Sequence, residues 1–209
     1  MSPRAAEHEN PTMVLPISGL PLSAEQIEEF VSTSPAVISA AEASKIKYYR
    51  DAAGRMRTEA NSADGTLRAI VLENPIDGFI AVLDPQTKSA HRVRFPKSSS
   101  TDGWGVGGGP SGLVGVSGNI TRKTVDLGKQ NMDGIEFEGS RTTTTSDEQT
   151  SLVAVDESWG SRELGLIGLV KHSGPDGEFT ARIQHVNRNI PDPALFVIPA
   201  DYRIHDMAP

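Results

Sequence analysis

The chain has 209 residues, a formal net charge of -7 and no cysteine. This length is enough for one well-buried domain, and the acidic balance argues against nucleic-acid binding, which needs concentrated Lys and Arg side chains. The lack of cysteine excludes disulfides, thiolate metal sites and thiol nucleophiles, and no run approaches the ~20 apolar residues of a membrane-spanning helix.

The first part of the chain is polar. Residues 1–15 carry mixed charge, two prolines and no periodicity, which predicts a disordered lead-in. They lack the apolar run that a signal peptide contains. We therefore expect either a cytoplasmic protein or a secreted protein whose leader was removed. Residues 23–31 fit a short helix that a capping box opens and, nearly as well, a strand in which Ile27 and Val31 share a face.

A first block of strands follows. Apolar and polar residues alternate in short runs, and Asp, Gly, Asn or Pro separates each run from the next, as in antiparallel hairpins. The predicted strands are residues 45–50, 55–60, 67–71, 79–84 and 91–95.

A long loop follows, because Ser and Gly dominate from 97 to 119. Gly103, Gly105 and Gly108 have the spacing of a dinucleotide fingerprint, but no helical period follows them, so we expect no nucleotide cofactor. Trp104 in this loop would either close over an apolar ligand or pack against the rim of the sheet.

A second block of strands completes the chain, at residues 122–127, 135–143, 152–159, 164–171 and 179–186. We therefore predict a mainly β protein. Its single antiparallel meander of about ten or eleven strands would form an open half-barrel, with at most one or two short helices. Residues 16–206 would be one domain.

Catalytic and metal-binding patterns are absent from the sequence. The histidines are scattered, no Gly-x-Ser-x-Gly nucleophile elbow is present, and adjacent Asp156 and Glu157 would point to opposite faces of a strand. We expect no catalytic residue, no metal and no cofactor. The alternation of apolar and polar residues places Glu157 on the apolar face of its strand, where it would be either a charge at the strand edge or the polar anchor of a pocket. It also places His185 on the same face as Phe179 and Ile183.

Several motifs resemble those of a family of bacterial secreted proteins of unknown function. They are the Tyr-Arg-Asp hairpin at 49–59, a turn at 74–78, a Leu-Asp-Pro hairpin at 83–92, strand motifs at 139–143 and 157–164, and a closing Pro-Asp-Pro motif at 188–202. The resemblance favours a strand at 23–31 and brings no catalytic residue. It implies a fold similar to periplasmic lipoprotein carriers, in which an incomplete barrel wraps a hydrophobic cavity.

The functional hypothesis is a non-enzymatic carrier or sensor of a lipid, acyl chain or acylated protein, located in the periplasm or secreted. The alternative is a module that binds a protein partner in envelope signalling or assembly. Residues predicted to line the ligand site on the concave face are Tyr48, Val71, Phe79, Phe95, Phe137, Val155, Trp159, Phe179 and His185.

Overall fold

The structure of the protein is a computed structural model, and it describes residues 20–32, 44–62, 64–95, 119–147, 152–175 and 177–208. These ranges form twelve strands and one 3₁₀ turn. They are β1 (Leu22–Ser32), β2 (Ser44–Arg50), β3 (Met56–Asn61), β4 (Leu67–Asn74), β5 (Phe79–Asp84), β6 (Ser89–Arg94), β7 (Ile120–Met132), β8 (Ile135–Ser146), β9 (Leu152–Ser161), β10 (Leu166–Gly174), β11 (Gly177–Asn187), η1 (Pro193–Phe196) and β12 (Arg203–Met207).

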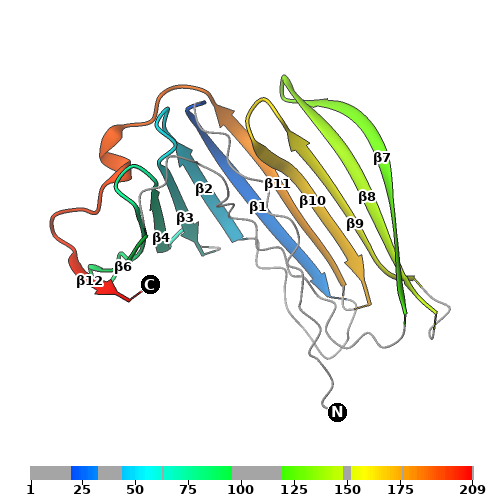
Figure 1. Ribbon diagram of the computed structural model, residues 1–209, viewed down its shortest axis with the longest axis horizontal. Helices are drawn as coiled ribbons and strands as arrows, with labels where there is room; N and C mark the ends of the chain where they lie inside the picture. The colour runs from blue at the N-terminus through cyan, green and yellow to red at the C-terminus, as the bar shows by residue number, and fades with distance from the viewer. Residues whose placement is uncertain are drawn as a thin grey trace, which may run out of the picture.

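All of these strands belong to one sheet, which bends from β12 at one end to β7 at the other and does not close into a barrel (Figure 1). β1 to β6 are successive antiparallel neighbours, and so are β7 to β11. The two blocks join where β1 pairs with β11, for example at Phe30 and Phe179. The C-terminal β12 returns to pair in parallel with β6. The predicted fold class, a mainly β open sheet, is confirmed.

The structure adds details that the sequence pattern left open. Residues 23–31 are a strand rather than a helix. β6 and β7, the strands on either side of the Gly-rich loop, lie at opposite ends of the sheet, so the blocks meet through β1 and not through the loop. The parallel strand β12 was not predicted. The lead-in at 1–15 and Trp104 lie outside the described residues.

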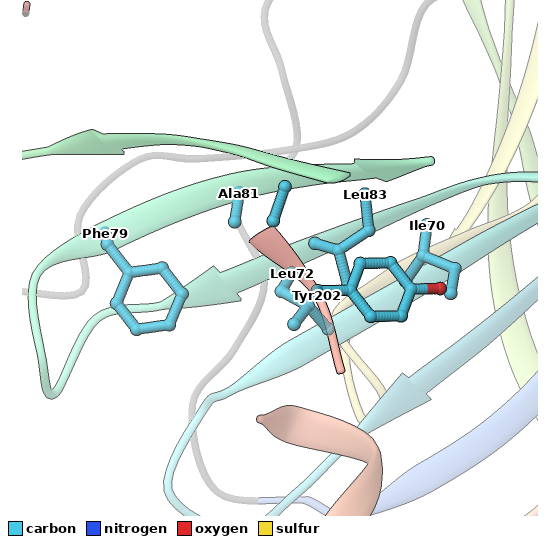
Figure 2. Packing of buried hydrophobic residues seen from close by; sticks show 7 residues of the cluster. Ile70, Leu72, Phe79, Ala81, Leu83 and Tyr202 are labelled. Carbon is cyan, nitrogen blue, oxygen red and sulfur yellow. The ribbon is translucent and has the colours of Figure 1, made fainter. Parts of the chain in front are cut away.

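The first hydrophobic core lies on one side of β4, β5 and β6, the side on which Phe79 points, here called the Phe79 face (Figure 2). The segment that follows β11, residues 188–202, is called the C-terminal segment. It packs on this core through Tyr202 and the half-buried Ile198. Burial of each such apolar side chain stabilises the fold by about 1.5–3 kcal/mol. The strand members of this core are Ile70, Leu72, Phe79, Ala81, Leu83 and Ala90.

The β2–β3 hairpin holds the same C-terminal segment in place. Asp51 accepts hydrogen bonds from the amides of Ala53 and Arg55, which forms the turn that the sequence predicts. The Arg55 guanidinium lies 5.4 Å from the ring centroid of Phe196. Arg57 Nη1 donates to the carbonyl of Leu195 at 3.1 Å. The β2–β3 hairpin and the C-terminal segment at 188–202 therefore hold each other in place.

A second core lies at one end of β1, β8, β9, β10 and β11. Two glycines allow its aromatic rings to lie flat on the sheet. A Cβ at Gly139 would lie 2.7 Å from the Trp159 ring, and one at Gly168 would overlap the Phe137 ring. Close backbone approach therefore requires glycine at both positions. The buried members are Leu22, Ala24, Ile135, Phe137, Trp159 and Leu164.

Candidate ligand-binding face

The side of β1 to β5 opposite the first core is the candidate site, and cross-strand register defines its residues. Residues directly opposite one another in antiparallel strands point to the same side. Tyr48 on β2 lies opposite Ala24 on β1 and Thr58 on β3. Thr58 in turn lies opposite Val71 on β4, which lies opposite Val82 on β5. These residues form one row across what we call the Tyr48 face.

A second row lies beside the first on the same face. Arg50 is opposite Leu22 and Met56, and Glu73 on β4 is opposite Met56 and Ile80. Five strands at about 4.8 Å spacing make each row about 19 Å long. Apolar side chains fill most positions of both rows, so the Tyr48 face of these strands is a mainly apolar strip.

The two faces of these strands differ in what covers them. Among the described elements, η1 contacts β3 and β4, although it is not their neighbour in the sheet. The Arg57 contact to Leu195 places η1 on the Phe79 face. The Tyr48 face is covered at its β1–β2 end, where Leu22 and Ala24 belong to the second core and Arg50 donates to the carbonyl of Leu164. On β3 to β5 this face has no comparable contact with a described element, and Val82 remains 48% exposed. Of the two faces, the Tyr48 face is therefore the candidate for a ligand in this part of the chain.

The Tyr48 ring is fixed by a short chain of hydrogen bonds. Its hydroxyl donates to Gln26 Oε1 at 3.2 Å, and Gln26 Nε2 donates to Glu28 Oε1 at 2.7 Å. Burial, together with the negative charge of Glu28, raises the pKa of Tyr48 to about 12. The phenol therefore keeps its proton at neutral pH and holds the ring as part of the apolar surface rather than as a base.

Thr58 and Glu73 are polar side chains in this strip that lack a partner among the described residues. Thr58 is 7% exposed, and its buried hydroxyl makes no hydrogen bond there. An unsatisfied buried hydroxyl costs about 1–3 kcal/mol. Glu73 has no described ion-pair partner, and burial raises the pKa of its carboxyl group. Both groups would gain from a ligand atom that forms a hydrogen bond.

The predicted site residues do not all lie together. Tyr48, Val71 and Phe179 share the Tyr48 side of the sheet. Phe95 follows β6, and its amide donates to the carbonyl of Gly78. Phe79 and, by register, Val155 lie on the opposite side. Phe137 and Trp159 pack in the second core with Leu22 and Ala24, at one end of the sheet.

His185 does not lie where alternation placed it. The β1–β11 register shifts between Ser23 and Glu25, and His185 has a φ of 53° at this bulge. Its ring nitrogen Nδ1 lies 3.3 Å from Glu25, whose side chain is on the Phe79 side of β1, and 73% of the side chain is exposed. The expectation that His185 shares a face with Phe179 is therefore wrong, because one extra residue breaks the two-residue period.

Glu157 has two close partners. It accepts a hydrogen bond from Trp159 Nε1 at 2.8 Å and pairs with Arg141 Nη2 at 2.8 Å. These two contacts lower the pKa of its carboxyl group. Register places Glu157 on the side opposite the Tyr48 face. Glu157 therefore orients Trp159 and does not contribute to the strip.

A hollow of about 510 Å³ lies elsewhere, between the β5–β6 turn and β12. Lys88 in its wall pairs with Asp201 at 3.2 Å and lies 4.9 Å from the Tyr202 ring centroid. Because most of its lining is polar and its lysine is already paired, this hollow does not suit an apolar ligand. Its lining is Thr87, Lys88, Ser89, Ala200, Asp201, Tyr202, Arg203 and His205.

Within the ranges that the structure describes, no group of three or more His, Asp or Glu side chains is arranged to hold a metal ion. No helix in these ranges is long and apolar enough to cross a membrane.

Similarity to known proteins lies in the fold. No family model matches the sequence, and no curated protein matches it. An uncharacterized conserved protein of Thermus thermophilus has a similar structure, with a TM-score of 0.52 and 9% identity over 90% of this chain and 91% of that chain. The protein thus belongs to a class of open, single-sheet folds.

Two further solved structures are more distant. The Mycobacterium tuberculosis lipoprotein LppX has a TM-score of 0.35 and 11% identity, over 81% of this chain and 88% of that chain. A LolA superfamily protein of Nitrosomonas europaea has a TM-score of 0.39 and 6% identity, over 88% of this chain and 92% of that chain. At such identities the likeness says nothing of function.

Proposed function

We propose that the protein is a non-enzymatic carrier or sensor of an apolar ligand, a lipid or acyl chain, that lies across β2 to β5 on the Tyr48 face. One observation carries the proposal: on β3 to β5 the Tyr48 face is mainly apolar and has no contact with a described element comparable to that of η1, whereas the C-terminal segment covers the Phe79 face. Val82 on this face is 48% exposed, and exposed apolar surface commonly marks a binding site.

The area of such a strip supports a modest affinity. A patch of about 400 Å², typical of the largest apolar patch on a monomer, contributes roughly 10 kcal/mol on burial. Association costs about 4 kcal/mol or more, which leaves an affinity of tens of micromolar or weaker. A carrier that must release its ligand works in this range.

A pair of matched variants tests this proposal. Val82 on the Tyr48 face is 48% exposed, and Val125 on β7, on the opposite side of the sheet, is 40% exposed. Both tolerate lysine, because neither is buried. Val82→Lys should weaken binding of the neutral fluorescent probe N-phenyl-1-naphthylamine at least about tenfold, since an ammonium is costly to desolvate. Val125→Lys should change it by less than about twofold. Equal effects, or no saturable binding to the unmodified protein, would refute the proposal.

The compartment is part of the same proposal. We place the protein outside the cytoplasm, in the periplasm or secreted, on the resemblance of its hairpin and C-terminal motifs to a family of secreted proteins. Fractionation of cells that express the chain from its own gene would test this placement. Recovery in the cytoplasmic fraction alone would contradict it.

A protein partner at the sheet edge is the alternative, and β7 favours it. This thirteen-residue outer strand is exposed at all but two positions, so its edge can accept another strand. A bulge between Asp126 and Gly128 limits such pairing to part of its length. A photo-crosslinker at Thr121 should then capture one specific protein in the native host, and one at exposed Arg68 on β4 should not.

A further inference from the structure

Thr58 and Glu73 are neighbours on the Tyr48 face. Glu73 follows Val71 by two residues along β4, so it points to the same side, and Val71 lies directly opposite Thr58. Such diagonal pairs across two strands lie about 7–8 Å apart between Cα atoms, and less between side chains. A head group of a few heavy atoms therefore spans the gap between the Thr58 hydroxyl and the Glu73 carboxylate.

The surroundings of the pair are apolar. Met56, Val71 and Ile80 flank Glu73 on its own strand or directly across from it. Arg50 is the cation in the same row, but it is two strands away, and its guanidinium donates to the carbonyls of Leu20 and Leu164. Among the described residues, nothing in this row therefore neutralises the Glu73 carboxylate.

Hydrogen-bonding capacity defines what the pair can recognise. An ionised carboxylate only accepts, and a threonine hydroxyl both donates and accepts. A ligand hydroxyl or ammonium can donate to Glu73, and a hydroxyl can also accept from Thr58. A ligand carboxylate would meet a like charge in an apolar setting, which is strongly unfavourable.

We propose that Thr58 and Glu73 select amphiphiles whose head group donates a hydrogen bond, a hydroxyl or an ammonium, and reject those with a carboxylate head. The proposal rests on the proposed function, because the apolar tail must lie along the Tyr48 row. The raised pKa of Glu73 agrees with it, since a donor head restores the interactions that burial removes from the carboxylate. The Thr58 hydroxyl is unpaired and buried, so a head group reaches it when the neighbouring side chains shift, and the hydroxyl then gains the hydrogen bond that it lacks.

The test compares three ligands with the same ten-carbon tail, namely decan-1-ol, decylamine and decanoate, at pH 7.5. Each is titrated below its aggregation limit against the bound N-phenyl-1-naphthylamine probe. Decylamine and decan-1-ol should displace the probe at concentrations about tenfold or more below those that decanoate needs, the factor expected for one hydrogen bond to a charged group. Equal displacement by all three would overturn the proposal.

Two isosteric variants assign the selectivity to these residues. In Glu73→Gln, decanoate should displace the probe at a concentration within about threefold of that needed for decan-1-ol, because the variant no longer places a negative charge beside the ligand carboxylate. Thr58→Val should weaken the binding of decan-1-ol about threefold or more and leave the affinity for the probe unchanged. Matched controls on the opposite side of the sheet are Glu29→Gln and Thr180→Val, which face each other across β1 and β11. They should leave the order of the three ligands as it is in the unmodified protein.

The outcomes separate this proposal from the one on which it rests. If the neutral probe does not bind, the apolar site itself is wrong and the head-group proposal falls with it. If the probe binds but Glu73→Gln leaves the discrimination unchanged, the site stands and the head-group proposal is overturned. Circular dichroism of each variant shows that the fold persists, and a variant that fails to fold is replaced by Glu73→Met or Thr58→Ala.

Discussion

Arg50 connects the two strand blocks at one end of the sheet, and its removal should be among the most damaging single changes. Its side chain is buried, with only 3% of the residue exposed. Nε donates to the carbonyl of Leu20 at 2.9 Å, and Nη2 donates to the carbonyl of Leu164 in the β9–β10 turn at 2.6 Å. Burial lowers the pKa of Arg50 from its ordinary value, but the guanidinium remains charged at neutral pH.

The magnitude follows from these two bonds. A hydrogen bond from a charged donor contributes about 1.5–3 kcal/mol, and each buried acceptor left alone adds a cost. Arg50→Ala should therefore lower the free energy of unfolding by roughly 3–5 kcal/mol, a large part of the total of about 5–15 kcal/mol for a domain. At about 2–4 °C per kcal/mol for this length, the melting temperature should fall by roughly 6–20 °C.

The assay is urea unfolding followed by far-UV circular dichroism, with Arg122→Ala as the control. Arg122 is exposed on the edge strand β7, so its removal should cost less than about 0.5 kcal/mol. Arg50→Lys should recover only part of the loss, because one ammonium does not reach both carbonyls in the geometry of the guanidinium. An Arg50→Ala protein as stable as the control would refute the inference that this side chain joins the blocks.

Three further predictions concern other parts of the sheet. Gly168→Ala should destabilise by about 2 kcal/mol or more in urea unfolding, because its methyl would overlap the Phe137 ring. Phe196→Ala should cost about 3–5 kcal/mol and expose the C-terminal segment to limited proteolysis, since this ring is 1% exposed. Burial raises the pKa of Glu73 above its ordinary 4.5, so its contribution to stability is fully present below that pH and is lost as pH rises through the folded value. Glu73→Gln should therefore gain stability over the unmodified protein as the pH rises from about 4 to about 8, and a constant difference would contradict this.

The local parts of the fold were predictable from the sequence, because turns and strands carry local signals. Asp51 and Gly54 predict the β2–β3 turn, where Gly54 has a φ of 81°. The pairing of β1 with β11 was not predictable in the same way. Strands that lie far apart in the chain, such as those of Phe30 and Phe179, carry no local sign of their contact.

The binding face was harder to predict than the strands. β4 and β5 are apolar at odd and even positions alike, since one side carries the core with Leu72 and Leu83 and the other carries Val71 and Val82. Alternation then gives no preference for either side. Phe79 was predicted as a ligand contact because it is aromatic and lies within an apolar run. In the structure it packs in the core under the C-terminal segment.

Thr58 and Glu73 were missed for a related reason. A threonine in a strand is common, and a glutamate at the end of an apolar run looks like the end of a strand. Only the register shows that they lie close together on one face. His185 was assigned to the wrong face for a different reason. A bulge at this residue, which has no signal in the sequence, turns its side chain to the side opposite the one that alternation predicts.

The most direct test of the binding face uses the lack of cysteine in the chain. A single cysteine at Val82, or at Val125 as the control, is labelled with a polarity-sensitive fluorophore, and decylamine is titrated below its aggregation limit. A ligand on the Tyr48 face should shift the emission of the label at position 82 saturably and leave the label at position 125 unchanged. No shift at position 82, or equal shifts at both positions, would contradict the account.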